Sequence, residues 1–146
     1  MTQKTALALL RAGHSIFLTG EAGAGKTHTI NEYVRFLREH KIAYAVTAST
    51  GIAATHISGM TIHSWSGIGT ARELSEAEIK NIAKTAHVAK RIRKAKVLII
   101  DEISMLDGRT LSLVETVCRV VRKTSLPFGG MQVLLVGDFY QLPPIS

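Results

Sequence analysis

Gly20-Glu21-Ala22-Gly23-Ala24-Gly25-Lys26-Thr27 decides the fold, because it fits the pattern G-x-x-x-x-G-K-[ST] of a phosphate-binding P-loop. Its glycines allow a tight turn in which successive backbone N–H groups converge on phosphate oxygens. An apolar segment, Ile16–Thr19, precedes the loop, and a helical pattern over about His28–His40 follows it. The motif requires this order of strand, loop and helix. The alternative, a glycine-rich turn with an accidental lysine, does not account for that context.

The residues of this loop suit a nucleotide held with Mg²⁺. The helix that follows aims its positive end at the same anion as the loop. Lys26 reaches the β- and γ-phosphates as a point charge, and Thr27 can ligate Mg²⁺. The residues expected at the nucleotide are Gly20, Ala22, Gly23, Ala24, Gly25, Lys26, Thr27 and His28.

Three further apolar segments indicate strands: Tyr44–Ala48, Val97–Ile100 and Gln132–Val136. They are nearly all apolar rather than alternating, as in strands that are covered on both faces. Helical patterns lie between them, and strand–helix–strand alternation favours a parallel sheet with right-handed crossovers. The sequence therefore predicts an α/β domain with helices layered on a parallel sheet.

Polar side chains follow two of these segments directly. Asp101 and Glu102 come after Val97–Ile100, where Asp101 would hold Mg²⁺ through water and Glu102 would orient or deprotonate the attacking water. Gln141 lies in the block that follows Gln132–Val136, and there it would sense the γ-phosphate. Loops at the carboxyl edge of a parallel sheet are where ligands bind. Two acids at an ordinary turn, and a solvent-facing amide before a proline, are the competing interpretations.

Composition limits the class of protein. The chain has 146 residues, 46% of them hydrophobic and 20% charged, which is one globular domain rather than a disordered segment. A single cysteine, Cys118, excludes a disulfide framework and a cysteine-based zinc site. No segment resembles a membrane span or a secretory signal, so we expect no membrane partner and an intracellular location, either the bacterial cytoplasm and nucleoid or, in a eukaryote, the nucleus or mitochondrion.

The net charge of +7 is concentrated in one segment. Residues 80–96 carry seven basic side chains and no acid, so the rest of the chain is neutral. The pattern predicts a helix over 75–94, capped by Ser75. On it, basic and histidine side chains form a stripe opposite an apolar face; they are Lys80, Lys84, His87, Arg91 and Lys94. Such a stripe either contacts a polyanion, faces a partner domain or is an ordinary solvated helix face.

Six blocks together resemble the first RecA-like motor lobe of superfamily I DNA helicases, in particular the Pif-type (petite integration frequency) group and, more distantly, the RecD-type helicases. The blocks are Gln3, Gly13–Thr27, Thr47–Ala54, Thr61–Gly69, Leu98–Gly108 and Pro127–Pro144. Gln3 stands 17 residues before Gly20, like the glutamine that reads adenine in the family. One departure is Ala24, where the family more often has threonine; a small residue in a backbone-lined loop is expected to have little consequence.

The resemblance implies a three-layer RecA-like lobe of a 5′-to-3′ ATP-driven translocase on single-stranded DNA. The resemblance also implies which residues contact the DNA strand. Short hydroxyls and backbone N–H groups suit this role, because they bind phosphates without reading sequence. The residues carried over are Thr47, Ser49, Thr50, Gly51, Thr61 and His63. The bland interpretations stay open: Ser49-Thr50 caps a helix over 51–58, His63 is a buried polar residue, and Trp65 belongs to the core.

The family works with two such lobes and ATP between them, and the second lobe supplies arginines to the transferring phosphoryl group. We therefore expect residues 1–146 to form a single N-terminal ATP-binding lobe, truncated after the block Pro127–Pro144 and nearly inactive alone. A non-catalytic nucleotide-binding interaction module is the main alternative, although an intact Glu102 and Gln141 have little use there. A P-loop nucleotide kinase leaves Asp101-Glu102 and the block around Gln141 unexplained.

Overall fold

The computed structural model describes residues 2–20 and 24–138, which form a five-stranded, fully parallel sheet in the order β1-β5-β4-β2-β3. The strands are β1 (Ile16–Gly20), β2 (Tyr44–Ala48), β3 (Met60–Thr61), β4 (Val97–Asp101) and β5 (Gln132–Asp138). The four predicted strands are confirmed to within two residues at their ends. β3 was not predicted, since two residues carry no periodicity.

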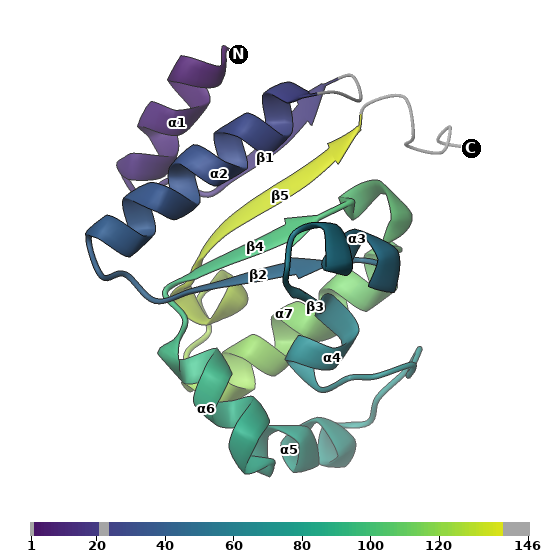
Figure 1. The fold of residues 1–146 in the computed structure, drawn as a ribbon. Coiled ribbons are helices and arrows are strands. Elements are labelled where there is room, and N and C mark those ends of the chain that lie inside the picture. Colours follow the sequence, from purple (N-terminus) through teal and green to yellow (C-terminus); the bar gives the residue numbers. More distant parts are fainter. Residues whose placement is uncertain (1, 21–23, 139–146) are drawn as a thin grey trace.

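Helices cover both faces of the sheet, so the three-layer arrangement is confirmed (Figure 1). One face is covered by α1 (Gln3–Arg11) and α2 (Ala24–Glu39). On the other face lie α4 (Ile62–Ser66), α5 (Glu76–Lys84), α6 (Ala86–Lys94) and α7 (Gly108–Arg122). The remaining elements are α3 (Gly51–His56) and two 3₁₀ turns, η1 (Ile103–Met105) and η2 (Pro127–Gly130).

β4 explains why a run of apolar residues marks a central strand. Val97 and Ile99 belong to the core under α1 and α2, whereas Leu98 and Ile100 belong to the core under α4 to α7. Because successive side chains point to opposite faces, a strand with two cores needs an apolar residue at every position. The strand therefore ends where the first polar side chain, Asp101, appears.

The single helix predicted over 75–94 is wrong in one respect, because the chain leaves helical geometry at Thr85 (φ −70°, ψ 112°). The start is as predicted: Ser75 and Glu78 form a reciprocal capping box. A straight helix of this length would extend about 30 Å. The break at Thr85 lets both halves, α5 and α6, pack on α7 instead.

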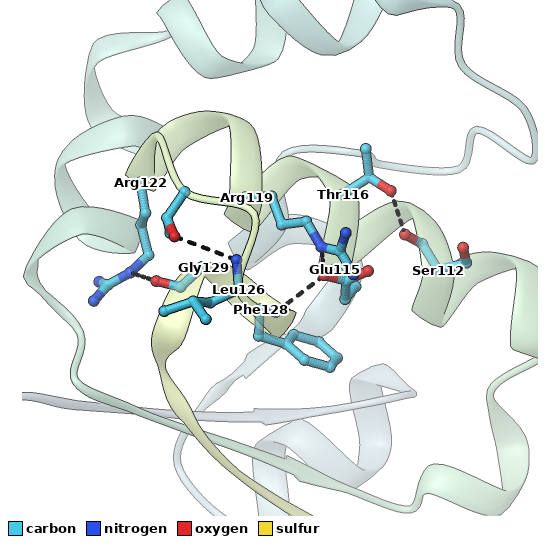
Figure 2. A network of polar contacts seen from close by, with 9 residues as sticks. Ser112, Glu115, Thr116, Arg119, Arg122, Leu126, Phe128 and Gly129 are labelled. Atoms are coloured by element: carbon cyan, nitrogen blue, oxygen red, sulfur yellow. Dashed lines mark hydrogen bonds and ion pairs between the residues drawn. The ribbon is translucent and has the colours of Figure 1, made fainter.

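A polar network on α7 holds the entrance to β5 (Figure 2). The Arg122 guanidinium donates from Nη1 to the carbonyls of α6 and the residue after it, Ile92 (3.0 Å), Arg93 (3.2 Å) and Ala95 (2.9 Å), and from Nε to Gly129 (2.8 Å). The Glu115 carboxylate accepts from the backbone N–H of Phe128 at 3.0 Å and pairs with Arg119. These bonds fasten η2, whose central residues Phe128 and Gly129 have positive φ, and so fix where β5 begins.

Candidate nucleotide site and strand-binding edge

The Lys26 side chain links the end of β1 to the carboxyl end of β5. Its ammonium Nζ donates to the carbonyl of Gly20 at 3.2 Å and to that of Gly137, near the end of β5, at 3.4 Å. The side chain is half-buried. Because β1 and β5 are neighbours, with Thr19 opposite Gly137, the lysine stands over two strand ends at once. An anion placed at this edge would meet a cation that backbone dipoles already hold in position.

Asp101, at the end of β4, lies close enough for its charge to interact with that of Lys26. Burial raises the pKa of its carboxyl above the ordinary value of 3.8, and the N–H of Glu102 (2.8 Å) and the charge of Lys26 oppose that shift. Asp101 and Thr27 also line the same concavity, of about 890 Å³. A carboxylate and a hydroxyl beside a phosphate site are donors that Mg²⁺ accepts, and this ion keeps several waters rather than a full protein cage. The residues present therefore fit Mg²⁺.

Glu102 has a strained backbone that its neighbours hold. It is in the left-handed region (φ 56°, ψ 42°), where a non-glycine residue is uncommon. Its carbonyl accepts the Ser49 hydroxyl at 2.7 Å and the N–H of Met105 at 3.0 Å. Ser49 also donates its own N–H to the Asp101 carbonyl at 3.2 Å. A residue predicted to contact DNA is thus bonded to the backbone carbonyls of both Asp101 and Glu102.

The other nucleotide-site predictions are placed as follows. Gln3, the first residue of α1, lies against the P-loop helix, since a β-carbon at Gly25 would come 2.7 Å from its amide nitrogen. Thr27 and His28 are exposed in the first turn of α2. Gly20 ends β1 and Ala24 begins α2. Ala22, Gly23 and Gln141 lie outside the residues that the structure describes.

The residues predicted to contact DNA gather where β2 and β3 end. Thr50 caps α3 by accepting the N–H of Ala53, and Thr61 caps α4 by accepting the N–H of Ser64. Gly51 is exposed and His63 is half-buried. The capping interpretation of Thr50 is confirmed, and so is the core interpretation of Trp65, which is 3% exposed.

Thr47 is different from these neighbours. Its side chain is completely buried and its hydroxyl donates to the carbonyl of Ile99 at 2.7 Å, inside the sheet. Side chains alternate between the two faces of a strand, so a position one residue before the strand end need not face the open edge. The Thr47 hydroxyl is therefore not available to a DNA strand at the protein surface.

The basic stripe also needs correction. Arg91 is not on an outer face: its guanidinium Nε donates to the carbonyl of Trp65 at 2.8 Å, and Nη2 donates to that of Ser64. It therefore ties α6 to the C-terminal turn of α4. Lys80, Lys84, His87 and Lys94 are exposed as predicted.

Two residues of the site were not singled out from the sequence. Gly137 supplies a carbonyl to Lys26, and a β-carbon there would lie 2.8 Å from Cγ2 of Ile103, so the turn after Glu102 packs directly on β5. Ser104, in that turn, has a buried hydroxyl with no hydrogen-bond partner in the described part of the chain. Both residues lie within motif blocks, Gly137 in Pro127–Pro144 and Ser104 in Leu98–Gly108, but neither residue type indicates by itself which contact it makes.

A P-loop lysine that reaches the strand beside its own, with an acidic pair on the next strand, defines a RecA-like P-loop NTPase lobe. A family model described as PIF1-like helicase matches residues 2–146. The chain belongs to the PIF1-like helicase family.

Known proteins match this sequence over almost its whole length. The chain is 52% identical over 146 residues to the ATP-dependent DNA helicase Pif1 of Psychrobacter sp. (strain PRwf-1), and the match covers all of this chain and 22% of that protein. The crystal structure of Pif1 helicase from Candida albicans matches with a TM-score of 0.89 and 42% identity, over 99% of this chain and 33% of that one.

A third match is the Bacteroides Pif1 helicase in complex with ADP-AlF3 and ssDNA, with a TM-score of 0.76 and 31% identity over 99% of this chain and 33% of that one. The chain thus spans about a fifth to a third of the length of these relatives. None of the helices described for residues 2–20 and 24–138 is long and apolar enough to cross a membrane.

Proposed function

We propose that residues 1–146 form the N-terminal RecA-like lobe of a 5′-to-3′ DNA helicase, which hydrolyses ATP with Mg²⁺ to move along single-stranded DNA. The observation that carries the proposal is the position of Lys26, held between the carbonyls of Gly20 and Gly137 and within reach of the Asp101 charge. Membership of the PIF1-like helicase family supports the same assignment. A protein with this function would act on DNA in a bacterial nucleoid or, in a eukaryote, in the nucleus or mitochondrion.

The roles of the residues follow from their chemistry. Lys26 binds the β- and γ-phosphates, and Thr27 and Asp101 hold Mg²⁺, Asp101 through water. The ion, when bound, neutralises charge that develops on the phosphates. Glu102 orients or deprotonates the attacking water, and Gln141 senses the γ-phosphate. At the other end of the nucleotide, Gln3 reads the adenine.

The DNA strand is proposed to lie across the ends of β2 and β3, against Thr50, Gly51, Thr61 and His63. Ser49, which is buried and donates its hydroxyl to the Glu102 carbonyl, would support this surface rather than present its hydroxyl to the DNA. Hydroxyls, an imidazole and backbone N–H groups bind phosphates of any sequence, which a motor that moves along DNA requires. A second RecA-like lobe would close on ATP from the other side and contribute arginines. This chain by itself is therefore expected to bind ATP weakly and to hydrolyse it very slowly.

Glu102→Gln in the intact protein tests the proposal. The wild type is expected to show DNA-stimulated ATP hydrolysis and to unwind a duplex with a 5′ single-stranded tail, not one with a 3′ tail. The variant keeps the shape of the side chain and loses the base, so its hydrolysis rate should fall by about 10²–10⁴ while ATP still binds. Glu39→Gln, at the exposed end of α2, is the matched control. An unaltered rate in Glu102→Gln would reject the catalytic role and favour a nucleotide-dependent interaction module.

A further inference from the structure

A basic groove runs between α5, α6 and the C-terminal end of α7. Two adjoining concavities of about 580 and 610 Å³ form it, and they share Arg93, Val121 and Lys123 as lining residues. Figure 1 shows the ends of α6 and α7 near the amino ends of β4 and β5. That is the edge opposite the P-loop, so the groove belongs neither to the nucleotide site nor to the proposed path of the DNA.

The rim of the groove carries positive charge that the described part of the chain leaves uncompensated. Lys80, Lys84, Arg93 and Lys123 are all exposed, and their side chains make no hydrogen bond or ion pair with the residues that the structure describes. No acidic side chain of residues 2–20 or 24–138 lines either concavity. Like charges gathered around a concave surface raise the local concentration of anionic groups.

The floor of the groove is apolar and made of small side chains. It contains Ala83, Ala86 and Ala89, together with Val121 and with Val120, which is 37% exposed. Alanines allow another backbone to approach closely, and an exposed valine gains free energy when it is covered. The groove therefore presents both a basic and an apolar surface. A partner that covers both must carry acidic as well as apolar side chains.

We propose that this groove binds an acidic amphipathic helix of a partner protein. The apolar side of that helix would cover Ala83, Ala86 and Val120, and its carboxylates would face the basic rim. Lys80 and Lys84 lie one helical turn apart, the same spacing as two carboxylates at i and i+4 on a partner helix. A contact confined to this groove would be small and reversible.

Phosphate backbone is the less suitable occupant. Lys and Arg alone hold a nucleic acid by its phosphates, and an alanine and valine floor adds nothing to that contact. No aromatic side chain on which a base could stack lines either concavity within the described residues. DNA binding here is thus the result that would overturn the proposal.

Lys123 offers a clean test variant. Its backbone is in the left-handed region (φ 55°), which glycine adopts without strain, so Lys123→Gly removes the charge without forcing the backbone. Lys41 is a matched control, because it is exposed, has the same φ of 55° and follows α2 on the other face of the sheet. Lys84→Glu, on an exposed position of α5, reverses a second charge.

The experiment uses the purified intact protein and a fluorescein-labelled synthetic helix, with leucines on one face and glutamates flanking them. Binding is followed by fluorescence anisotropy. Saturable binding is expected. Lys123→Gly should weaken it about two- to five-fold, and Lys84→Glu with Lys123→Gly by about ten-fold or more. Lys41→Gly should leave it unchanged. Circular dichroism and DNA-stimulated ATPase activity, measured in parallel, establish that each variant is folded and separate this proposal from the helicase assignment.

Three outcomes would overturn the proposal. The first is no saturable binding of the leucine–glutamate helix. The second is equal affinity for a version with serine in place of every leucine, since the apolar floor would then be unused. The third is a loss of affinity for a labelled oligothymidine in the groove variants while peptide binding is unchanged, which would make the groove a nucleic-acid surface.

Discussion

Ser49→Ala is expected to slow ATP hydrolysis without weakening ATP binding. The Ser49 hydroxyl donates to the carbonyl of Glu102 at 2.7 Å, and Ser49 is only 7% exposed, so no bulk water replaces the bond. Glu102 needs this restraint because its backbone is left-handed. Alanine removes the hydroxyl and leaves the N–H bond from residue 49 to Asp101, so Asp101 should stay in place.

The magnitude follows from two opposing terms. The left-handed conformation costs a non-glycine residue about 1–2 kcal/mol, and a neutral hydrogen bond stabilises by about 0.5–1.5 kcal/mol net. Removing the bond therefore frees Glu102 to leave its position for part of the time. Since 1.4 kcal/mol is tenfold in an equilibrium, a loss of about 1 kcal/mol lowers the population of the observed conformation by at most about five-fold. We expect kcat to fall about two- to five-fold.

The assay is steady-state ATP hydrolysis by the intact protein at saturating single-stranded DNA, with ATP affinity measured separately by a fluorescent analogue. Saturating DNA removes any effect of Ser49 on strand affinity. Thr116→Ala is the matched control, because its hydroxyl donates to the carbonyl of Ser112 at 2.9 Å on α7, away from the site (Figure 2). A wild-type kcat in Ser49→Ala, with unfolding stability lowered by the lost bond, would show that the bond supports the fold and does not position Glu102.

Three other predictions concern stability and reactivity. Arg122→Met removes the donor of four backbone carbonyls and should lower the free energy of unfolding by about 2 kcal/mol, about 8 °C in Tm, whereas Arg109→Met at an exposed pair should change it by less than about 0.5 kcal/mol. Burial raises the pKa of the Asp101 carboxyl, so the ligand-free protein loses stability as pH rises through that pKa. Asp101→Asn should therefore have a larger free energy of unfolding than the wild type at neutral pH. Urea titrations should show that this difference disappears below pH 3.8, the ordinary pKa of the group. Burial raises the pKa of Cys118 to about 12, so a thiol-specific disulfide reagent at mildly alkaline pH should label it only after denaturation.

The sequence predicted those parts of the fold that depend on local pattern. β4 could be recognised because a strand buried on two faces must be apolar throughout, and the P-loop because its chemistry fixes residue types at fixed spacing. The break at Thr85 could not be predicted in this way. Helical periodicity reports which face a residue occupies and not whether the axis stays straight, and the break depends on packing of α5 and α6 against α7.

The arginines show the same limit for side chains. Arg91 and Arg122 are indistinguishable in sequence from exposed basic residues, yet both donate to backbone carbonyls of other elements. Those partners, Trp65 for the first and Ile92 and Ala95 for the second, lie 26 to 30 residues away along the chain. Which arginine is structural therefore depends on tertiary contacts that no local pattern contains.

The edge of β2 suggests how strand binding and hydrolysis would be connected under the proposed function. Thr47 donates to the carbonyl of Ile99, and Ser49 donates to those of Asp101 and Glu102, so residues 47 and 49 fasten the end of β2 to the acidic end of β4. Residue 50 then leaves the sheet to cap α3, where DNA is proposed to lie. A DNA strand that displaces Thr50 and α3 must either break these hydrogen bonds or move Asp101 and Glu102 as well. Because buried hydrogen bonds are costly to leave unmade, the second response is favoured. Under the proposed function, movement of the DNA strand would therefore shift the catalytic residue Glu102.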